Sequence, residues 1–171
     1  MDPRAPLLKS SFEIAHMVFN AVVSDLDERM GRHSAPGATI PTPAAIMAHA
    51  LYSQDMMVNE HVRQQPTVLQ TGGFAAKTGL AAPEPSMSPA FLSQVFDVDA
   101  LREYAAALFA QTAAFLESPP PGDLDRVITT PLGSPMNAAT YLASFGLVHL
   151  AQHTGEISAV KGVLGVKGLP F

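Results

Sequence analysis

The sequence has no cysteine among its 171 residues. A chain without cysteine can form no disulfide and no iron–sulfur cluster, and it has no thiol nucleophile of its own. Any thiol chemistry would therefore need a thiol that arrives with a cofactor. The composition fits a cytoplasmic protein, and we expect that location.

Positive charge is also scarce. Ten Lys and Arg residues stand against fifteen Asp and Glu residues, which gives a formal charge of −5, and the basic residues are scattered along the chain. A protein that binds nucleic acid through its phosphates needs a basic face. We therefore expect no nucleic-acid partner, and no attraction to an acidic membrane surface either.

Long apolar runs are missing as well. No run approaches the ~20 residues that a membrane-spanning helix requires. Residues 1–6 lack the charged-then-apolar order of a signal peptide. Chains of this length usually form one domain and can bury a substantial core. We therefore expect residues 1–171 to form a single domain.

Apolar residues recur at spacings of three and four in four segments, which is the pattern of amphipathic helices. Thr42-Pro43 and Ser134-Pro135 each combine a hydroxyl N-cap with proline at the first helical position. The predicted helices are 6–30, 43–65, a segment capped by Asp97 or Asp99 that ends at Pro119, and 134–164.

The connections between these helices differ in length. Residues 31–41 form a short connector, and the β-branched stretch 127–133 suggests an extended arm or a small hairpin. Residues 66–96 have no period, and we expect a loop packed across one end of the bundle as a wall of the site. The predicted fold is all-α, a four-helix bundle with a long crossover loop between helices 2 and 3.

Two histidines lie four residues apart in the last predicted helix, on a stripe where core leucines would be expected. A helix places His149 and His153 about one turn apart on the face that turns toward its bundle partners. Buried imidazoles and a carboxylate are costly unless they are hydrogen-bonded or bound to a ligand. The stripe consists of Leu142, Gly146, His149, His153, Glu156, Val160 and Val163.

The second helix adds His49 on its inward face. With His149 and His153 it could complete a three-nitrogen metal site with an open coordination position, as in catalytic zinc sites. The alternative is a set of hydrogen-bonded core histidines, because H-x-x-x-H alone has many false positives. His16 also lies on a core-like stripe, and its simplest interpretation is a core or outer-shell residue. His61 lies about 120° round the second helix from His49, and we expect it to meet solvent.

Further polar residues lie near these histidines. Glu156 follows His153 by one turn; it either pairs with a polar neighbour or orients a ligand imidazole and transfers protons. Tyr52 and Asp55 flank the turn of His49 and are candidate pocket residues. We name Glu156 and Tyr52 as candidate catalytic residues.

The run H-L-A-Q-H-T-G-E-I over 149–157 and the ending K-G-V-L-G-V-K-G-L-P-F over 161–171 resemble the DinB-like superfamily of metal-binding four-helix bundles. The likeness extends to P-A-A-I-M-A-H over 43–49 and, more weakly, to 72–80. It implies a bundle, often dimeric, that binds a divalent metal through one histidine of the second helix and an H-x-x-x-H pair of the fourth. At the matching positions these are His49, His149 and His153.

The resemblance also implies a range of activities. Characterised members are similar to thiol-dependent transferases and isomerases that use low-molecular-weight bacterial thiols, and many members have no known activity. We expect zinc or nickel, a small-molecule substrate, a low-molecular-weight thiol if the reaction is a transfer, and a homodimer. The leading hypothesis is a metal-dependent thiol S-transferase, isomerase or hydrolase. The alternatives are a non-catalytic metal-binding or stress-response bundle with a structural ion, and a metal-free interaction module.

Overall fold

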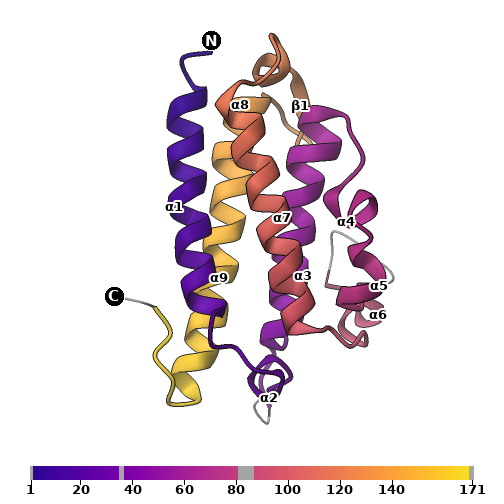
Figure 1. Cartoon of the computed structure of the whole chain (residues 1–171), viewed down its shortest axis with the longest axis vertical. Helices are drawn as coiled ribbons and strands as arrows, with labels where there is room; N and C mark the ends of the chain where they lie inside the picture. The colour runs from indigo at the N-terminus through magenta and orange to yellow at the C-terminus, as the bar shows by residue number, and fades with distance from the viewer. Residues whose placement is uncertain (1, 35–36, 81–86, 170–171) are drawn as a thin grey trace.

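The computed structural model describes residues 2–34, 37–80 and 87–169. Four long helical arms lie side by side in it (Figure 1). The arms are α1 (Ala5–Val23); α3 (Pro43–Asp55) continued by η1 (Met56–Arg63); α7 (Val98–Glu117); and α8 (Ala138–Tyr141) continued by η3 (Leu142–Leu147) and α9 (Val148–Val163). The shorter elements are α2 (Glu28–Gly31), α4 (Val68–Thr71), α5 (Phe74–Thr78), α6 (Pro89–Leu92), η2 (Asp123–Asp125), β1 (Val127–Thr129) and β2 (Pro135–Asn137).

The four arms form a square in cross-section. Both α1 and α3 pack against α7 and against α9. The chain runs down α1, up α3, back along the side of the bundle, up α7 and down α9 (Figure 1). The parallel arms α3 and α7 require a long crossover, which confirms the predicted all-α bundle. Within the described ranges, no helix is both long and apolar enough to cross a membrane.

The crossover contains the short helices α4, α5 and α6, so the prediction of a stretch without secondary structure was wrong; residues 81–86 of it lie outside the described part. Thr67 and Ser88 cap α4 and α6 with their side-chain oxygens. α4 and α5 pack along α7, beside the bundle rather than across one end of it (Figure 1).

A buried carboxylate fixes the start of this crossover. Asp55 is fully buried, and its Oδ2 accepts hydrogen bonds from the Tyr104 hydroxyl at 2.5 Å and the Leu69 N–H at 2.9 Å. Its Oδ1 accepts from Asn59 Nδ2 at 2.6 Å and the Val68 N–H at 3.0 Å. The carboxylate thus caps the N-terminus of α4. Asp55 is a structural group, and not the pocket residue that we considered from the sequence.

α1 ends at Val23 and not at the predicted Met30. Lys161 of α9 is buried, and its ammonium donates to the Val22 carbonyl at 2.7 Å and to the Asp25 carboxylate. A cation at the C-terminus of a helix satisfies the carbonyl groups there and favours the helix dipole. The helix therefore stops where α9 supplies this lysine.

The fourth arm begins later than predicted. β1 pairs with β2 in an antiparallel hairpin, which confirms the predicted small hairpin, and Ser134-Pro135 belongs to this hairpin rather than to a helix start. The helix begins at Ala138, because Asn137 Oδ1 accepts from the Thr140 N–H at 2.8 Å and caps it.

Both histidine-bearing arms contain a π-helical stretch, η1 after His49 and η3 before His149. A π-helical turn shifts the angular register of the residues that follow it. His61 is therefore half-buried, with its Nδ1 2.8 Å from the Tyr141 hydroxyl, so it meets solvent only in part.

Most of the buried residues of α9 follow the predicted ones by one position in the sequence. The two metal-ligand candidates of α9 are half-buried beside them, and Val163, predicted inside, is 76% exposed. The buried residues of α9 are Leu150, Thr154, Ile157, Val160 and Lys161, so Val160 is buried as predicted.

Candidate metal centre

His49 lies in the second turn of α3. Thr42 and Pro43 begin this helix as predicted, with Thr42 Oγ1 accepting from the Ala45 N–H at 3.4 Å. Almost every residue of α3 is buried, because the helix contacts α7, α9 and the crossover. His49 is itself 6% exposed, so its ring nitrogens need partners within the protein.

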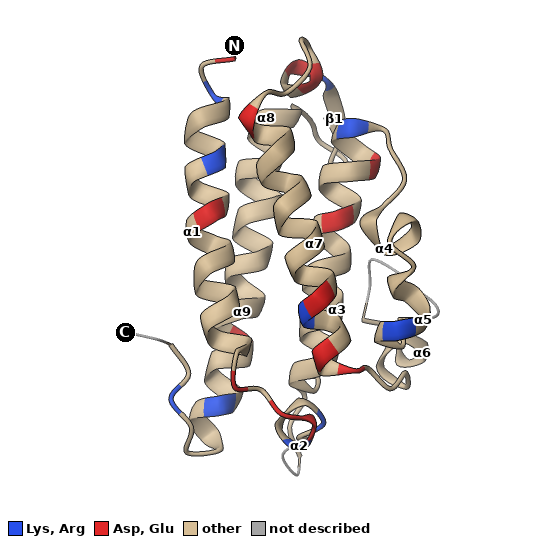
Figure 2. Cartoon of the chain, in the orientation of Figure 1, with Lys and Arg blue, Asp and Glu red and all other residues tan. Residues whose placement is uncertain are grey.

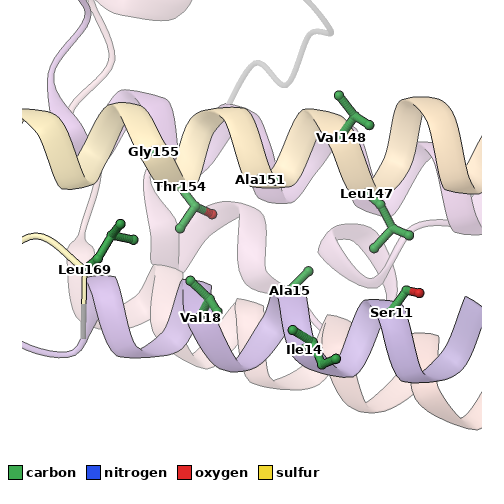
Figure 3. Close-up of a pocket in the computed structure, with 10 residues that line it drawn as sticks. All are labelled: Ser11, Ile14, Ala15, Val18, Leu147, Val148, Ala151, Thr154, Gly155 and Leu169. Atoms are coloured by element: carbon green, nitrogen blue, oxygen red, sulfur yellow. The ribbon is translucent and has the colours of Figure 1, made fainter. Parts of the chain in front are cut away.

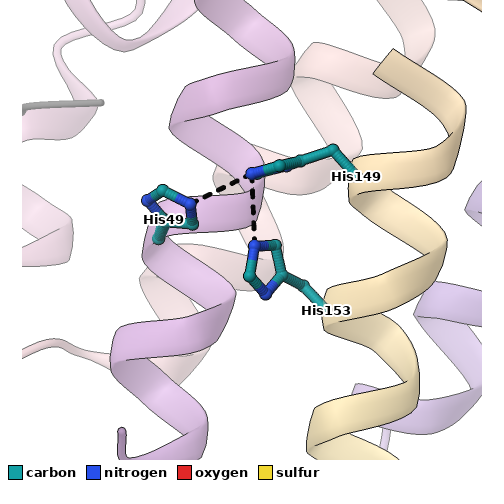
Figure 4. Close-up of side chains that lie close together, drawn as sticks. All are labelled: His49, His149 and His153. Carbon is teal, nitrogen blue, oxygen red and sulfur yellow. Dashed lines mark hydrogen bonds between the residues drawn. The ribbon is translucent and has the colours of Figure 1, made fainter. Parts of the chain in front are cut away.

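His149 and His153 face this ring from α9. Figure 4 shows the three imidazoles converging, one from α3 and two from α9. His149 Nε2 lies 3.1 Å from His49 Nε2 and 3.2 Å from His153 Nε2. One nitrogen of each residue can be chosen so that all three lie within 4.8 Å of one another.

Hydrogen bonds among these three nitrogens cannot give every one of them a partner. His149 Nε2 has at most one proton to share between two facing nitrogens. His49 Nδ1 is buried and has no hydrogen-bond partner among the described residues. Three convergent imidazole nitrogens are the donor set that binds zinc and related divalent ions.

Glu156 is hydrogen-bonded to the cluster. Its Oε2 lies 2.6 Å from His153 Nδ1. In the neutral ring, Nδ1–H therefore donates to the carboxylate, and the lone pair of Nε2 points at the other two histidines. This contact corresponds to the orienting role considered for Glu156, because such carboxylates fix the tautomer of ligand histidines.

Burial keeps two of the rings neutral. It lowers the pKa of His49 to about 4, with a further lowering by the nearby His153. Burial likewise lowers the pKa of His149 to about 3, and both other rings contribute. Imidazoles with these pKa values retain their lone pairs at neutral pH, which metal binding requires.

The spacing also fits a metal ion. Zn–N bonds of about 2.0–2.1 Å in tetrahedral geometry place two nitrogens roughly 3.3 Å apart. The two Nε2–Nε2 distances are 3.1 Å and 3.2 Å. For these two pairs of nitrogens, little movement would therefore be needed to accommodate an ion.

Tyr52, the other candidate catalytic residue, is half-buried one turn after His49. In the described part of the chain, no hydrogen bond or ring contact joins Tyr52 to the three histidines. Burial raises the pKa of Tyr52, and the acidic side chains of Glu60 and Asp55 raise it further. Its catalytic role stays a prediction.

His16 lies apart from the cluster. Its Nε2 is 2.9 Å from Gln54 Nε2, which also donates to Thr112 Oγ1 at 3.4 Å. The ring stacks on Phe109 with the centroids 3.7 Å apart. His16, Gln54 and Thr112 form a buried polar layer, referred to below as the His16 layer. These contacts support the interpretation of His16 as a core residue.

Sequence reasoning missed Phe91 of α6. Its ring meets His49 edge to face, with the centroids 6.2 Å apart and an interplanar angle of 81°. The crossover thus reaches the cluster, as expected of a wall of the site. Ser88-Pro89 could have located α6, because it repeats the cap-plus-proline signal of Thr42-Pro43.

Comparison with known proteins agrees with this architecture. A family model described as the DinB superfamily matches residues 11–157. The fold is similar to that in a crystal structure of a conserved protein from Enterococcus faecalis, with a TM-score of 0.75 and 18% identity over 94% of this chain and 96% of that one. At this identity the likeness concerns the fold alone. No protein of curated function gives a significant match.

Proposed function

Because the chain belongs to the DinB superfamily, we propose that His49, His149 and His153 bind one divalent metal ion and leave a coordination position open. The observation that carries this proposal is the convergence of three imidazoles from two helices. We favour zinc or nickel, because imidazole ligands suit both ions.

We further propose an enzyme that acts on a small molecule, as a thiol S-transferase, an isomerase or a hydrolase. A divalent ion held by three imidazoles supplies Lewis acidity to a thiol or water ligand at the open position. Since the chain has no cysteine, a transferred thiol must come from outside, as a low-molecular-weight co-substrate.

Glu156 is the group best placed to move a proton. It holds His153 through one carboxylate oxygen, and 42% of its side chain is exposed. A carboxylate that is both hydrogen-bonded to a ligand and open to solvent can accept a proton from a substrate without releasing the imidazole.

Two other residues support the site in this proposal. Tyr52 carries its phenolic proton at neutral pH, as an ordinary phenol does, and burial raises its pKa further, so it can serve as a hydrogen-bond donor. Phe91 covers one edge of the His49 ring and keeps water from it.

One observation favours the alternative of a structural ion. The three candidate ligands bridge α3 and α9, which are packed against each other along the bundle. An ion between them would therefore tie two arms together and add its binding free energy to folding.

A turnover assay separates the two functions. Metal-loaded protein is incubated with low-molecular-weight thiols and carbon electrophiles, and thiol consumption is followed. We expect turnover that His153→Ala abolishes and Glu156→Gln lowers by roughly 10- to 100-fold. Leu132→Ala, at an exposed position in the hairpin turn, is the control that should keep full activity. Absence of turnover with every pair, together with strong stabilisation by metal, would favour the structural ion.

A further inference from the structure

Two hollows of about 550 Å³ each lie on the surface of the bundle, and their linings differ. The first lies between α1 and α9, and Figure 3 shows small and apolar side chains along it, with two hydroxyl groups as the polar members. The second, called the η1–β1 pocket below, is lined by Glu60, His61 and Gln64 on one side and by residues 126–129 on the other. Of the two, only the η1–β1 pocket presents charged side chains, and they are of both signs.

The η1–β1 pocket is separate from the metal centre. His61 follows His49 by twelve residues on the same helical arm, which places them roughly 15 Å apart along its axis. None of the three metal-ligand candidates lines the pocket. Figure 2 shows acidic and basic segments meeting at this end of the bundle, beside β1. A ligand in the pocket would therefore bind without touching a metal ion at the three histidines.

Arg126 is held at the edge of the pocket by two contacts within the protein. Its Nε donates to the Val62 carbonyl at 3.1 Å, and its Nη2 donates to Asp123 Oδ1 at 3.1 Å. Nη1 takes part in no hydrogen bond within the described ranges, and 32% of the side chain is exposed. Asp123 offsets part of the positive charge, but the Nη1–H groups stay available. A guanidinium fixed in this way can donate to a carboxylate in the pocket.

His61 offers a second donor, because Tyr141 fixes its tautomer. The buried Tyr141 hydroxyl lies 2.8 Å from His61 Nδ1 and has no other partner among the residues that the structure describes. Burial raises the pKa of Tyr141 to about 12, and it lowers the pKa of His61, so the ring is neutral at neutral pH. The hydroxyl therefore donates to Nδ1, and Nε2 carries the proton of the ring. That Nε2–H makes no hydrogen bond in the described part of the chain.

Glu60 supplies the opposite charge. It is half-buried, and no hydrogen bond or ion pair joins its carboxylate to another described residue. Glu60 and Arg126 thus line one pocket without pairing with each other. A partly buried carboxylate without a partner is costly, and an ammonium group in the pocket would provide that partner.

The backbone on this side of the pocket is unusual. η1 is π-helical, and π-helical turns are frequent at functional sites. It ends at Gln64, whose φ of 53° and ψ of 43° are left-handed. For a residue other than glycine this conformation costs about 1 kcal/mol. A glycine would avoid the cost, but it would remove the amide side chain that lines the pocket.

We propose that the η1–β1 pocket binds the α-ammonium and α-carboxylate groups of an amino acid. The carboxylate accepts hydrogen bonds from Arg126 Nη1 and His61 Nε2, and the ammonium donates to Glu60. Val127, which follows Arg126 in the pocket lining and is 70% exposed, gives an aliphatic side chain an apolar surface to cover.

Ligands with a single charge fit the pocket less well. A simple anion would pair with Arg126 and be repelled by Glu60, and a simple cation would meet the reverse situation. A zwitterion placed between the two side chains pairs with both, although they are too far apart to pair directly. The requirement for both charges therefore distinguishes this proposal from general electrostatic attraction.

Isothermal titration calorimetry of the full chain with L-leucine, L-glutamine and glycine tests the proposal. We expect saturable binding, with a dissociation constant for leucine of about 1 mM or below. 4-Methylpentanoate lacks the ammonium of leucine and isopentylamine lacks its carboxylate, so each should bind at least about tenfold more weakly. Because amino acids also chelate divalent ions, the titration is repeated with His149→Ala, which should bind leucine as tightly as the wild type does.

Glu60→Gln should raise the dissociation constant for leucine by about 10- to 100-fold, because the hydrogen bond to the ammonium loses its charge. It should not weaken the binding of 4-methylpentanoate, which has no ammonium. Arg126→Gln should weaken leucine to a similar degree, and circular dichroism checks that both variants fold. Glu103→Gln, at an exposed glutamate on α7, is the matched control and should stay within about twofold of the wild type.

Four results would overturn the proposal. They are the absence of saturable binding for all three amino acids up to about 20 mM, equal affinity for leucine and 4-methylpentanoate, unchanged leucine affinity in Glu60→Gln, and loss of binding in His149→Ala. The last result would place the amino acid at the metal centre. Failure of the metal proposal alone would leave leucine binding intact, so the two proposals can be told apart.

Discussion

His16 and the three-histidine cluster are both buried in one helical bundle, yet their ring nitrogens face different groups. In the His16 layer, Nε2 accepts from the Gln54 amide and the ring stacks on Phe109. In the cluster, Nε2 of His149 faces two other imidazole nitrogens at 3.1 Å and 3.2 Å. His16 and His49 are equally buried, at 6% exposure each, but the partners of their rings differ.

The comparison shows how a core histidine is distinguished from a candidate ligand. Burial lowers the pKa of His16 to about 4, as it does for His49, so neither charge state nor exposure separates the two residues. The difference lies in lone pairs. The side-chain amide of Gln54 pairs with Nε2 of His16, whereas the cluster presents several lone pairs to one point, where a cation can accept them.

The largest expected difference between the two places is in metal-dependent stability. Zinc or nickel at about a thousand times Kd should raise the free energy of unfolding by ~4 kcal/mol. For a chain of this length that corresponds to a rise in Tm of roughly 8–16 °C. Calorimetry should show the rise abolished in His153→Ala and retained in His16→Gln. Loss of the rise in both variants would remove the distinction between the two places.

Truncation within the His16 layer should instead affect the fold. His16→Ala should lower the free energy of unfolding by about 3 kcal/mol, because it leaves a cavity beside Phe109 and an unpaired Gln54 amide. Metal content should stay at the wild-type value. Urea unfolding and elemental analysis of the same preparation measure both quantities, and a loss of metal here would place His16 among the ligands.

Glu156 tests how the cluster is oriented. Glu156→Gln should weaken metal binding by about 10- to 100-fold, because the amide is a poorer acceptor for His153 Nδ1–H. Competition with a chromophoric chelator gives the dissociation constant. Glu103→Gln, a change at an exposed glutamate on α7, should leave it unaltered. Equal affinity in the wild type and Glu156→Gln would argue against an orienting role.

The smallest expected effect is a pH dependence of the metal-free protein. The pKa of His16 is about 4 when folded, below its usual 6.5, so between these values the unfolded chain binds a proton that the native chain does not. Stability should therefore fall as pH drops from 6.5 to 4. His16→Gln should reduce this slope by up to about 1.4 kcal/mol per pH unit. An unchanged slope in urea melts would contradict the assignment.

Much of the architecture could be predicted from periodicity. Long helices repeat their pattern over several turns, and in α7 the residues Tyr104, Leu108 and Thr112, at spacings of four, are all buried. The grouping of His49 with His149 and His153 followed from the same reasoning, since inward faces of neighbouring helices meet.

Other features could not be predicted, for physical reasons. α4, α5 and α6 have four or five residues each, too few to show a period. The π-helical stretch η1 changes the register of the backbone without a distinctive side-chain pattern, and His61 lies within it. Val163 is exposed because a strict four-three repeat drifts round a 3.6-residue helix over the two heptads that follow His149. Ser134-Pro135 has the composition of a helix start, but a strand adopts it just as well at the edge of a hairpin.

Metal content is the most direct test of the central claim that three histidines form a metal centre. Untagged wild type, His149→Ala and the control His33→Ala would be loaded with zinc or nickel, dialysed and measured by mass spectrometry. We predict about one divalent ion per chain in the wild type and in His33→Ala, and almost none in His149→Ala. Wild-type protein without metal after loading, or full occupancy in His149→Ala, would contradict the claim and return His49, His149 and His153 to the core.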